Sequence, residues 1–486
     1  MNFFVRISLF ILFLVISRIG YSQAPTGKII VNIGYFEEVK GMVKVLLFDS
    51  TAKKVSSRNI TQALRKKEVL VDSVYMTVVF DSMPAGRYAI EVIHDKNSSG
   101  KFEYRYEDYA FSNDARVRYG PVHFAQAAFN FNGSDLKLYL YLENDQSAKY
   151  TNHYSNSTSY SPVISYAPET SLLLGANVVK LFKFKHDSLT RTSYADAFAA
   201  VTLNKQFAVE QNYTIFTNHE KYILTGFTGI QYFPQYYFGV GNTVSQSNKE
   251  QIKYTQFRFE HLVLRKIYGK LFAGVGYRYV NVFNMSSGPT GVMETSQVAG
   301  YRGSVVSGVQ FAIASDNRNN VYNTTKGHLV RLRVLLNSSK IGSSYNFNLY
   351  EADLRKFIRV NGSKRILALQ AYGYFTEGNV PWSEMGALGS DVIMRGYYSG
   401  RYRDKNYIAA QAEYRISLNK VGGFVFFAGF GEVAHTLNAF TVQGLKPDAG
   451  LGYRFTIDRR ERLNVRLDYG IGRNTTNFYF TIAEAF

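Results

Sequence analysis

The residues best suited to hold a metal ion lie in one short segment near the N-terminus. Oxygen-bearing side chains alternate there around a glycine, at Asp95, Asn97, Ser99, Gly100 and Glu103. This spacing is typical of a calcium loop, in which alternate oxygens converge on the ion and the glycine permits a sharp turn. However, Tyr106 stands where such a loop carries its bidentate glutamate. We therefore favour a hairpin turn rich in Asn, Ser and Gly, with Ca²⁺ at Asp95, Asn97, Ser99 and Glu103 as the alternative.

No motif assembles side chains for catalysis. The chain contains no cysteine, which excludes disulfides, thiolate metal sites and a catalytic cysteine. Its eight histidines are dispersed without metal-ligand spacing, and no G-x-S-x-G nucleophile elbow occurs. We therefore expect no catalytic residues and no required cofactor, and we expect that the protein is not an enzyme.

The first residues predict export of the protein from the cytoplasm. Arg6 precedes an apolar run at 7–17, and small residues follow at Gly20 and Ser22. This pattern is typical of a secretory signal peptide at 1–22; a retained membrane anchor is the alternative, but the run is shorter than the ~20 residues of a spanning helix. No later run of ~18 apolar residues occurs, so a mature chain that enters a membrane must do so as a β-barrel. In this compartment we expect no nucleic-acid partner, although the formal net charge is +19.

A small domain follows at 27–143. It contains five predicted strands separated by turn residues, at 28–35, 42–49, 74–80, 87–94 and 136–142. Alternation of apolar and polar residues in the last of them is typical of a half-buried strand, and several such strands predict a β-sandwich. Residues 144–166 are rich in Ser, Asn, Thr and Tyr without periodicity, and they predict a linker.

From residue 167 onward, apolar and polar residues alternate in segments of about ten residues, as in transmembrane strands with one face to lipid and one to a lumen. In 463–472 the odd positions are apolar and the even positions are polar or glycine. In 407–416 the even positions are apolar. We therefore expect Glu413 and Asp468 to face the lumen.

The fold class predicted by these segments is all-β, with a 16-stranded transmembrane antiparallel β-barrel at 167–486 after a periplasmic β-sandwich domain. The predicted strands lie at 171–182, 193–203, 207–217, 221–233, 236–246, 253–265, 271–283, 305–316, 328–337, 345–359, 366–376, 407–418, 424–434, 448–457, 463–472 and 477–486. An even number returns the chain to its side of origin. Short connections are expected on the periplasmic side, at 204–206, 234–235 and 458–462. Long extracellular loops are expected at 284–304, 377–406 and 435–447.

The final segment carries apolar residues on one face and ends on an aromatic residue. These positions are Phe478, Phe480, Ile482 and Phe486. A terminal aromatic residue on an amphipathic last strand is a feature that outer-membrane assembly machinery recognises. We interpret these four residues as a C-terminal sorting signal.

The connection 377–406 contains MRGYYSGRYRDK at 394–405, after LGSD at 388–391. This sequence resembles the sixth-loop arginine motif of the BamA/TamA-like outer-membrane protein insertase superfamily, also called bacterial surface antigen barrels. Further similarity lies in PETSLLLGA (168–176), YFGVGN (237–242), SDNRNNVYNTTKGH (315–328) and the ending AEAF (483–486). In the small domain, 83–103 and 109–121 resemble a family of small secreted β-sandwich domains of unknown function.

The resemblance implies that the loop folds back into the lumen, where its arginine pairs with acidic residues on strands 12 and 13. The matching arginine is Arg395, followed by Gly396 and Tyr397, and the strand-12 partner is Glu413. An arginine can meet a carboxylate with two parallel hydrogen bonds, which would hold the loop in place. The alternative is that Arg395 only plugs the barrel.

Strand 13 departs from the family pattern, because Gly429 stands where the family usually has an aspartate. One of the two expected acidic residues is therefore missing, and we expect either a weaker latch or Glu432 or Glu384 as the second partner.

For function, the resemblance implies assembly, insertion or translocation of outer-membrane proteins, at the cell outer membrane. The expected partners are outer-membrane lipids including lipopolysaccharide, and unfolded outer-membrane protein clients or other envelope proteins. A seam between strands 1 and 16 could disturb the bilayer or template a client strand. Family members usually receive clients through POTRA domains by strand addition, and here the domain at 27–143 takes their place.

Two alternatives remain open. One is a non-catalytic accessory or scaffold barrel that docks a partner complex through its periplasmic domain. The other is a passive anion-preferring pore, suggested by the 38 basic and 23 acidic side chains of residues 144–486.

Overall fold

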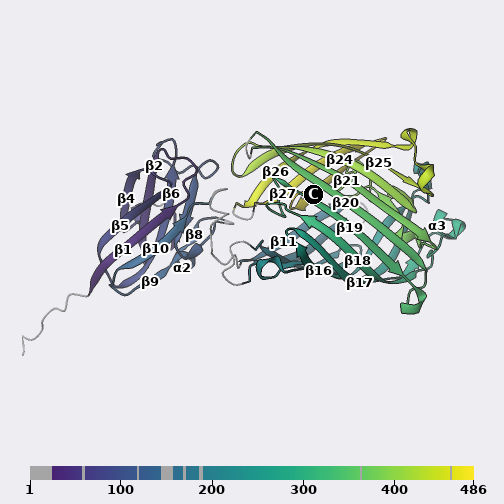
Figure 1. The fold of residues 1–486 in the computed structure, drawn as a ribbon, viewed down its shortest axis with the longest axis horizontal. Coiled ribbons are helices and arrows are strands. Elements are labelled where there is room, and N and C mark those ends of the chain that lie inside the picture. The colour runs from purple at the N-terminus through teal and green to yellow at the C-terminus, as the bar shows by residue number, and fades with distance from the viewer. Residues whose placement is uncertain are drawn as a thin grey trace, which may run out of the picture. The chain divides into compact units, whose positions relative to one another are not determined.

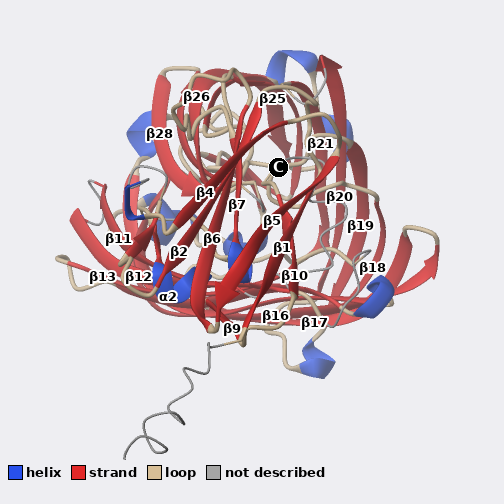
Figure 2. Cartoon of the chain, turned by 90° about the vertical axis from the view of Figure 1, so that its left-hand side faces the viewer, coloured by secondary structure: helices blue, strands red, loops and turns tan. Residues whose placement is uncertain are grey.

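The computed structural model describes residues 25–56, 61–117, 120–143, 157–167, 171–184, 190–361, 364–459 and 462–486. The predicted signal peptide at 1–22 lies outside these residues. The chain divides into two compact units, 1–151 and 152–486 (Figure 1). Most of the described chain is strand, and the helices are short (Figure 2). Within the described residues, no helix is long and apolar enough to cross a membrane.

The N-terminal unit contains two main sheets. One has the order β10–β1–β5, formed by β10 (Leu136–Tyr141), β1 (Thr26–Gly34) and β5 (Tyr75–Pro84). The other has the order β4–β2–β6–β7, formed by β4 (Arg65–Leu70), β2 (Met42–Asp49), β6 (Gly86–Asp95) and β7 (Asp108–Phe111), with β9 (Phe129–Phe131) also paired to β6. Aliphatic residues from both sheets, such as Val31 and Val45, form a common core. The N-terminal β-sandwich prediction is therefore confirmed, with β4, β7 and β9 as additions.

The central strands of the second sheet, β2 and β6, are buried on both faces, whereas the edge strand β4 is exposed. Alternate residues of β2, such as Leu46 and Phe48, enter a second apolar core beneath β3 (Lys54–Val55), β8 (Val122–His123) and α2 (Phe124–Ala127). For this reason β2 is apolar at most positions on both faces, and its one internal charge, Lys44, is buried and paired with Asp95.

The second unit is a sixteen-stranded antiparallel barrel, in which each strand pairs with its neighbours in chain order apart from two short strands of one loop. Its strands are β11 (Ser157–Ala167), β12 (Ser171–Phe182), β13 (Ser193–Thr202), β14 (Phe207–Phe216), β15 (Tyr222–Tyr237), β16 (Glu250–Tyr268), β17 (Leu271–Ser286), β18 (Ser304–Asp316), β19 (Gly327–Asn337), β20 (Phe347–Asn361), β21 (Arg365–Gly378), β24 (Asn406–Ser417), β25 (Gly422–Ala434), β26 (Lys446–Asp458), β27 (Leu463–Gly472) and β28 (Thr475–Ile482). The predicted number of strands is confirmed.

Two of the predicted strand assignments are wrong, and their errors cancel in the count. Residues 157–166 are not a linker, because β11 lies there and pairs with β12 along its whole length. Conversely, the predicted strand at 221–233 continues through 234–235 and ends at Tyr237 as β15. The separate strand predicted at 236–246 is wrong, because the chain leaves the ladder after Tyr237 and returns to it at Glu250 as β16. The predicted turn at 234–235 therefore does not exist.

Because the prediction omitted β11, it also assigned one connection to the wrong end of the barrel. With β11 counted, the turn at 203–206 connects the third and fourth strands, and therefore lies at the same end as the long loop between β21 and β24. We call this end the loop end and the opposite end the turn end. The prediction that 204–206 lies with the short connection at 458–462 is wrong.

Proline explains why β11 and β15 were difficult to predict. Pro162 lies in β11, which is the first strand of the ladder, and Pro234 lies in the part of β15 beyond the reach of β14. Because proline lacks a backbone N–H, it is tolerated where a strand lacks a neighbour on one side. Each of these strands lacks a paired strand on one side at its proline.

The barrel wall buries polar residues on its inner face and exposes apolar residues on its outer face. Along β27 the even residues from Asn464 to Gly470 are buried, and along β24 Gln411, Glu413 and Arg415 are buried. Outward residues of β28 such as Phe478 are exposed. The predicted alternation is thus present in these strands.

Candidate functional site

The loop between β21 and β24, residues 379–405, lies inside the barrel. It contains the 3-10 helix η7 (Trp382–Glu384) and two short paired strands, β22 (Gly386–Leu388) and β23 (Tyr402–Asp404). Trp382, Met394, Arg395 and Tyr397 are almost completely inaccessible to solvent. We call this segment the lumen loop.

Arg395 joins two strands of the inner wall. Its Nη2 lies 2.6 Å from Oε1 of Glu413 on β24, and its Nη1 lies 2.8 Å from Oδ2 of Asp468 on β27. All three side chains have no exposed surface. Since a buried charge is tolerated only when it is paired, the two carboxylates hold the guanidinium in one place.

The two strands between these carboxylates also contact the loop. Phe427 of β25 lies under the guanidinium, with the Arg395 Cζ atom 3.6 Å from the ring centroid. Asp448 of β26 accepts a hydrogen bond of 3.2 Å from the Gly396 N–H. Four consecutive wall strands therefore each contribute one contact to the Arg395–Gly396 pair.

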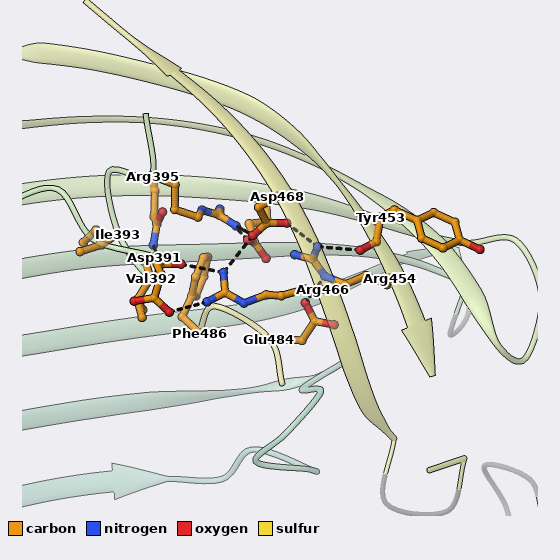
Figure 3. A network of polar contacts seen from close by, with 12 residues as sticks. Asp391, Val392, Ile393, Arg395, Tyr453, Arg454, Arg466, Asp468, Glu484 and Phe486 are labelled. Atoms are coloured by element: carbon orange, nitrogen blue, oxygen red, sulfur yellow. Dashed lines mark hydrogen bonds and ion pairs between the residues drawn. The ribbon is translucent and has the colours of Figure 1, made fainter. Parts of the chain in front are cut away.

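Asp468 is the centre of a larger charged network (Figure 3). Its carboxylate also pairs with Arg454 at 2.5 Å and with Arg466 at 2.9 Å. Arg466 in turn pairs with Asp391 of the lumen loop at 2.9 Å, so the loop is held at a second residue. Charges of opposite sign alternate through this network, which favours a fixed arrangement in a site with little water.

Gly396 allows the loop backbone to lie directly on β27. A Cβ atom at position 396 would lie 2.5 Å from the carbonyl carbon and oxygen of Ile471, and one at Gly470 would lie 2.6 Å from the Arg395 oxygen. These are backbone atoms that cannot move away cheaply. Glycine is therefore required on both sides of the contact.

Tyr397, the residue after Gly396, also forms hydrogen bonds with the inner wall. Its hydroxyl donates to the Pro447 carbonyl at 2.8 Å and accepts from the Arg473 N–H at 2.9 Å. Its own carbonyl accepts from the Tyr479 hydroxyl at 3.2 Å. The three consecutive residues Arg395, Gly396 and Tyr397 therefore all contact the inner wall.

The second acidic partner of Arg395 is neither Glu384 nor Glu432, so that part of the sequence prediction is wrong. Glu384 pairs with Arg278 of β17 at 2.5 Å, and the Glu432 carboxylate accepts from Asn242 and from the Thr441 N–H. The partner is Asp468, two strands beyond β25. Glu384 instead fixes the start of the lumen loop to the opposite part of the wall.

Gly429, the glycine noted in the sequence of the thirteenth strand, lies on β25 beside an acidic residue of β26. Gly429 lies directly opposite Asp448, and a Cβ atom at 429 would lie 2.8 Å from Oδ1 of Asp448. An aspartate at 429 would bring two carboxylates together, so the glycine leaves room for Asp448. The carboxylates that contact Arg395 and Gly396 therefore lie on β24, β26 and β27.

The last residues of the chain turn into the barrel. β28 ends at Ile482, so the prediction of a strand up to residue 486 is wrong there. Glu484 lies beside Arg454 (Figure 3) and pairs with it at 2.7 Å. The Phe486 carbonyl accepts from Arg415 at 2.9 Å. Since Arg415 also pairs with Glu413, the C-terminal segment is bonded to the same network as Arg395.

Among the four residues of the predicted sorting signal, three share one face and the fourth does not. Phe478, Phe480 and Ile482 are exposed on the outer face of β28. Phe486 is buried inside the barrel beside Phe357. The structure therefore has the predicted apolar face on the outside of β28, and the terminal Phe486 lies apart from it.

The candidate calcium segment does not present free oxygens to an ion. The Asp95 carboxylate accepts from the Ser99 and Gly100 N–H groups, each at 2.9 Å, and pairs with Lys44 at 2.9 Å. Asn97 donates to Glu103 at 3.0 Å. Within the described residues, no group of three His, Asp or Glu side chains could hold a metal ion.

Ionisation in this segment follows from the same contacts. Burial would raise the pKa of Asp95, but hydrogen bonds from Lys44, Gly100 and Ser99 hold it below the ordinary value. Glu107, close by, has the opposite shift: burial, together with the charges of Asp95 and Glu103, raises its pKa to about 7.

Sequence reasoning missed Asp448 and Glu484 as contacts of the lumen network and did not connect Asp468 to Arg395. For Asp468 a signal exists, since it is the single carboxylate on the inward face of 463–472. For the other two, no local pattern indicates that they approach the loop, because these contacts join residues far apart in sequence.

Two family models match this chain. The family described as "Uncharacterized protein conserved in bacteria (DUF2141)" matches residues 31–138, and the family described as "Omp85 superfamily domain" matches residues 130–486. The comparison with curated proteins finds no match.

Three solved structures are similar to this chain at low sequence identity. BamA from Haemophilus ducreyi lacking POTRA domains 1–3 has 13% identity and a TM-score of 0.44, with 72% of each chain covered. CdiB from Acinetobacter baumannii has 13% identity and a TM-score of 0.44, with 73% of this chain and 62% of that chain covered. CdiB from Escherichia coli has 8% identity and a TM-score of 0.46, with 72% and 65% covered. Because the Omp85 match extends over well more than half of the residues, this chain belongs to the Omp85 superfamily.

Proposed function

We propose that this protein is an outer-membrane barrel that assembles, inserts or translocates other envelope proteins. In this proposal the N-terminal domain lies in the periplasm and the loop end of the barrel faces outward. The clients are unfolded outer-membrane proteins or other exported proteins, and the surrounding lipids include lipopolysaccharide. The exposed aromatic residues of β28 and Phe486 act as the sorting signal in the protein's own assembly.

The observation that carries the proposal is the buried Arg395 between Glu413 and Asp468. A barrel that only anchored a domain would need no fully buried guanidinium in its lumen, since burying charges costs free energy that their pairing only partly returns. The network keeps the lumen loop in one position against β24 to β27. We infer that this latch supports the barrel while a client passes or pairs with it.

The edge strands suit a seam that opens. β11 is rich in Ser and Thr and contains Pro162, and it is the first strand of the ladder, whereas β28 is the last. Such strands pair weakly, and an unpaired edge offers backbone groups to a client strand. In our proposal the C-terminal segment, bonded to the lumen network through Glu484 and Arg415, links the seam to the latch.

The first test is depletion of the protein followed by quantitative proteomics of the outer membrane. A selective loss of some barrels or surface proteins is expected. An unchanged outer-membrane proteome would overturn an assembly role, because the measurement requires no assumption about which clients depend on the protein.

The second test separates a latch from a plug. Arg395→Ala should reproduce the loss of clients although the variant barrel is present in the membrane at the normal level. If the variant instead restores all clients and only raises ion conductance, the loop acts as a plug. Arg302→Ala is the matched control, because Arg302 forms an exposed ion pair with Glu294 outside the network.

A second candidate function is an accessory barrel that docks a partner through the N-terminal domain. The observation that favours it is a tyrosine patch on the three-stranded sheet, where Tyr35 lies 5.2 Å from Tyr75 and 5.4 Å from Tyr141 between ring centroids. Tyr75 and Tyr139 are strongly exposed, and tyrosines are enriched in protein interfaces. If Tyr75→Ser with Tyr139→Ser abolishes function while the barrel stays folded, docking is essential; if function persists, this candidate fails.

A further inference from the structure

The barrel wall has a step at its loop end, formed by two hairpins of unequal length. β14 pairs with β15 from Phe216 only to Phe207, which lies opposite Tyr232. β15 continues to Tyr237 and pairs there with β16 as far as Glu250. Beyond Tyr232, therefore, β15 has β16 as its neighbour on one side and the short turn at 203–206 on the other.

A hollow of about 490 Å³ lies at this step. Its lining consists of Leu203, Asn204, Lys205, Gln206, Tyr232, Pro234, Gln251 and Lys253. This lining contains two lysines and three side-chain amides but no carboxylate. In the part of the chain that the structure describes, Lys205 and Lys253 form no ion pair, unlike the arginines of the lumen.

The hollow lies above an apolar band of the outer wall. Val201 and Leu203 on β13 and its turn, and Phe207 and Val209 on β14, are exposed on the same hairpin that borders the hollow. On the outer surface of a barrel such residues face lipid chains. The step therefore joins a cationic, amide-rich recess to a surface suited to acyl chains.

We propose that this hollow binds the phosphorylated saccharide head group of an outer-leaflet glycolipid. The two ammonium groups pair with phosphate oxygens, which strengthens the hydrogen bonds because both partners are charged. The amides of Asn204 and Gln251 face the sugar hydroxyl groups, and the acyl chains lie on the apolar band. A phospholipid head group carries a single phosphate, which one lysine can pair, and it offers no ring of sugar hydroxyl groups to the Gln251 amide.

The inference rests on the outer-membrane orientation in the proposed function, but not on any role in client handling. If the glycolipid does not bind, the depletion result is unaffected. If depletion leaves the proteome unchanged, glycolipid binding can still be measured. The two proposals can therefore fail independently.

The test uses native mass spectrometry of the full-length mature chain in detergent with added bisphosphorylated lipid A. The wild type is expected to retain one lipid A molecule, and K205Q/K253Q is expected to retain it at least tenfold more weakly. The matched control is K180Q/K356Q, which removes two exposed lysines from the outward faces of β12 and β20 away from the step. This control should bind within about twofold of the wild type, since a general charge effect falls off over about 10 Å.

Two further probes define the head group. Dephosphorylated lipid A and phosphatidylglycerol should each bind more weakly than bisphosphorylated lipid A, and neither should depend on both lysines. The proposal is overturned if K205Q/K253Q binds like the wild type, if the control pair loses binding equally, or if phosphatidylglycerol binds as tightly with the same dependence on the lysines.

A second variant is needed because substitution of Lys205 also affects the backbone of the turn. Lys205 has a positive φ of 59°, so its replacement could alter the turn. K253Q changes only a residue paired within the β15–β16 ladder. We expect it to weaken lipid A binding at least threefold with the barrel folded, and unchanged binding by this folded variant would also overturn the proposal.

Discussion

The two units of this protein bury opposite kinds of side chains. In the N-terminal domain the fully buried residues between the sheets are aliphatic, such as Val45 and Ile90. In the barrel the fully buried residues include Arg395 and Glu413, whereas Phe480 of the outer wall is exposed. The difference follows from the surroundings: the domain excludes water from an apolar interior, while the barrel presents its apolar face to lipid.

The interior of the N-terminal domain and the lumen of the barrel are therefore stabilised by different interactions. An apolar core is stabilised by area removed from water and tolerates small changes of shape. A charged lumen must pair every ion, because a guanidinium left alone in a site of low dielectric constant is costly. Matched substitutions in the two units should therefore have very different effects.

The largest effect is expected from a charge placed in the apolar core. Val45→Asp buries a carboxylate without a partner, and it should cost about 5 kcal/mol, comparable with the whole stability of a domain of this size. Protease sensitivity of residues 25–143 in isolated membranes measures this change. Val69→Asp, at an exposed position of β4, should leave the domain resistant. Equal resistance of the two variants would contradict the assignment of the core.

The converse change removes a charge from the lumen. Asp468→Ala leaves Arg395, Arg454 and Arg466 close together without their shared carboxylate. Breaking a buried pair in this way typically costs about 3–5 kcal/mol. The heat-dependent mobility shift of the folded barrel should move to lower temperature.

The matched control for Asp468 is Glu294→Ala, because Glu294 pairs with Arg302 on the surface of a loop. A surface pair is worth about 1 kcal/mol or less. If both variants melted at the same temperature, the lumen network would contribute no more than a surface ion pair.

A pH effect is expected in the N-terminal domain. The pKa of Glu107 is raised from 4.5 to about 7, so the folded domain binds this proton more tightly than the unfolded chain. The stabilisation is complete below about pH 4.5 and is lost as the pH rises through 7, with a total of about 3 kcal/mol. Urea unfolding of the domain at pH 5 and pH 8 measures it. Glu107→Gln should remove the dependence, and a variant that kept it would assign the proton to another group.

The smallest effect is expected where the loop backbone meets the wall. Gly396→Ala places a Cβ atom 2.5 Å from the Ile471 carbonyl, and overpacking of this kind costs about 1–3 kcal/mol. Displacement of the lumen loop should raise single-channel conductance. Gly288→Ala is the control, since its Cβ atom would meet no atom closer than 3.8 Å. Unchanged conductance in both variants would show that the loop does not depend on this contact.

Much of the fold could be predicted from sequence because it is encoded locally. Alternation along 463–472 assigns the inward face of β27 correctly, and the same holds for Glu413 on β24. These predictions need only the two-residue period of a strand and a lipid-facing exterior. The strands that were predicted wrongly, β11 and β15, contain prolines. A local pattern does not reveal that one side of such a strand lacks a neighbour.

The site was predictable only in part. The pairing of Arg395 with Glu413 follows from the resemblance of the loop motif and from the inward parity of the strand. Asp468 was correctly placed on the inner face, yet nothing near it in the sequence connects it with a residue 73 positions away. The burial of Phe486 beside Arg415 was not predictable either, because the segment after β28 carries no periodic pattern.

By itself, therefore, the sequence determined which residues face lipid and which face the lumen, because that choice depends only on alternation along each strand. Only the tertiary structure decided which charges meet. When the strands curve into a barrel, β24 to β27 bring four inward residues to one point on the lumen loop. β25 contributes Phe427 there, and the carboxylates come from β24, β26 and β27. Such contacts depend on the curvature and register of the whole wall, and no local pattern contains them.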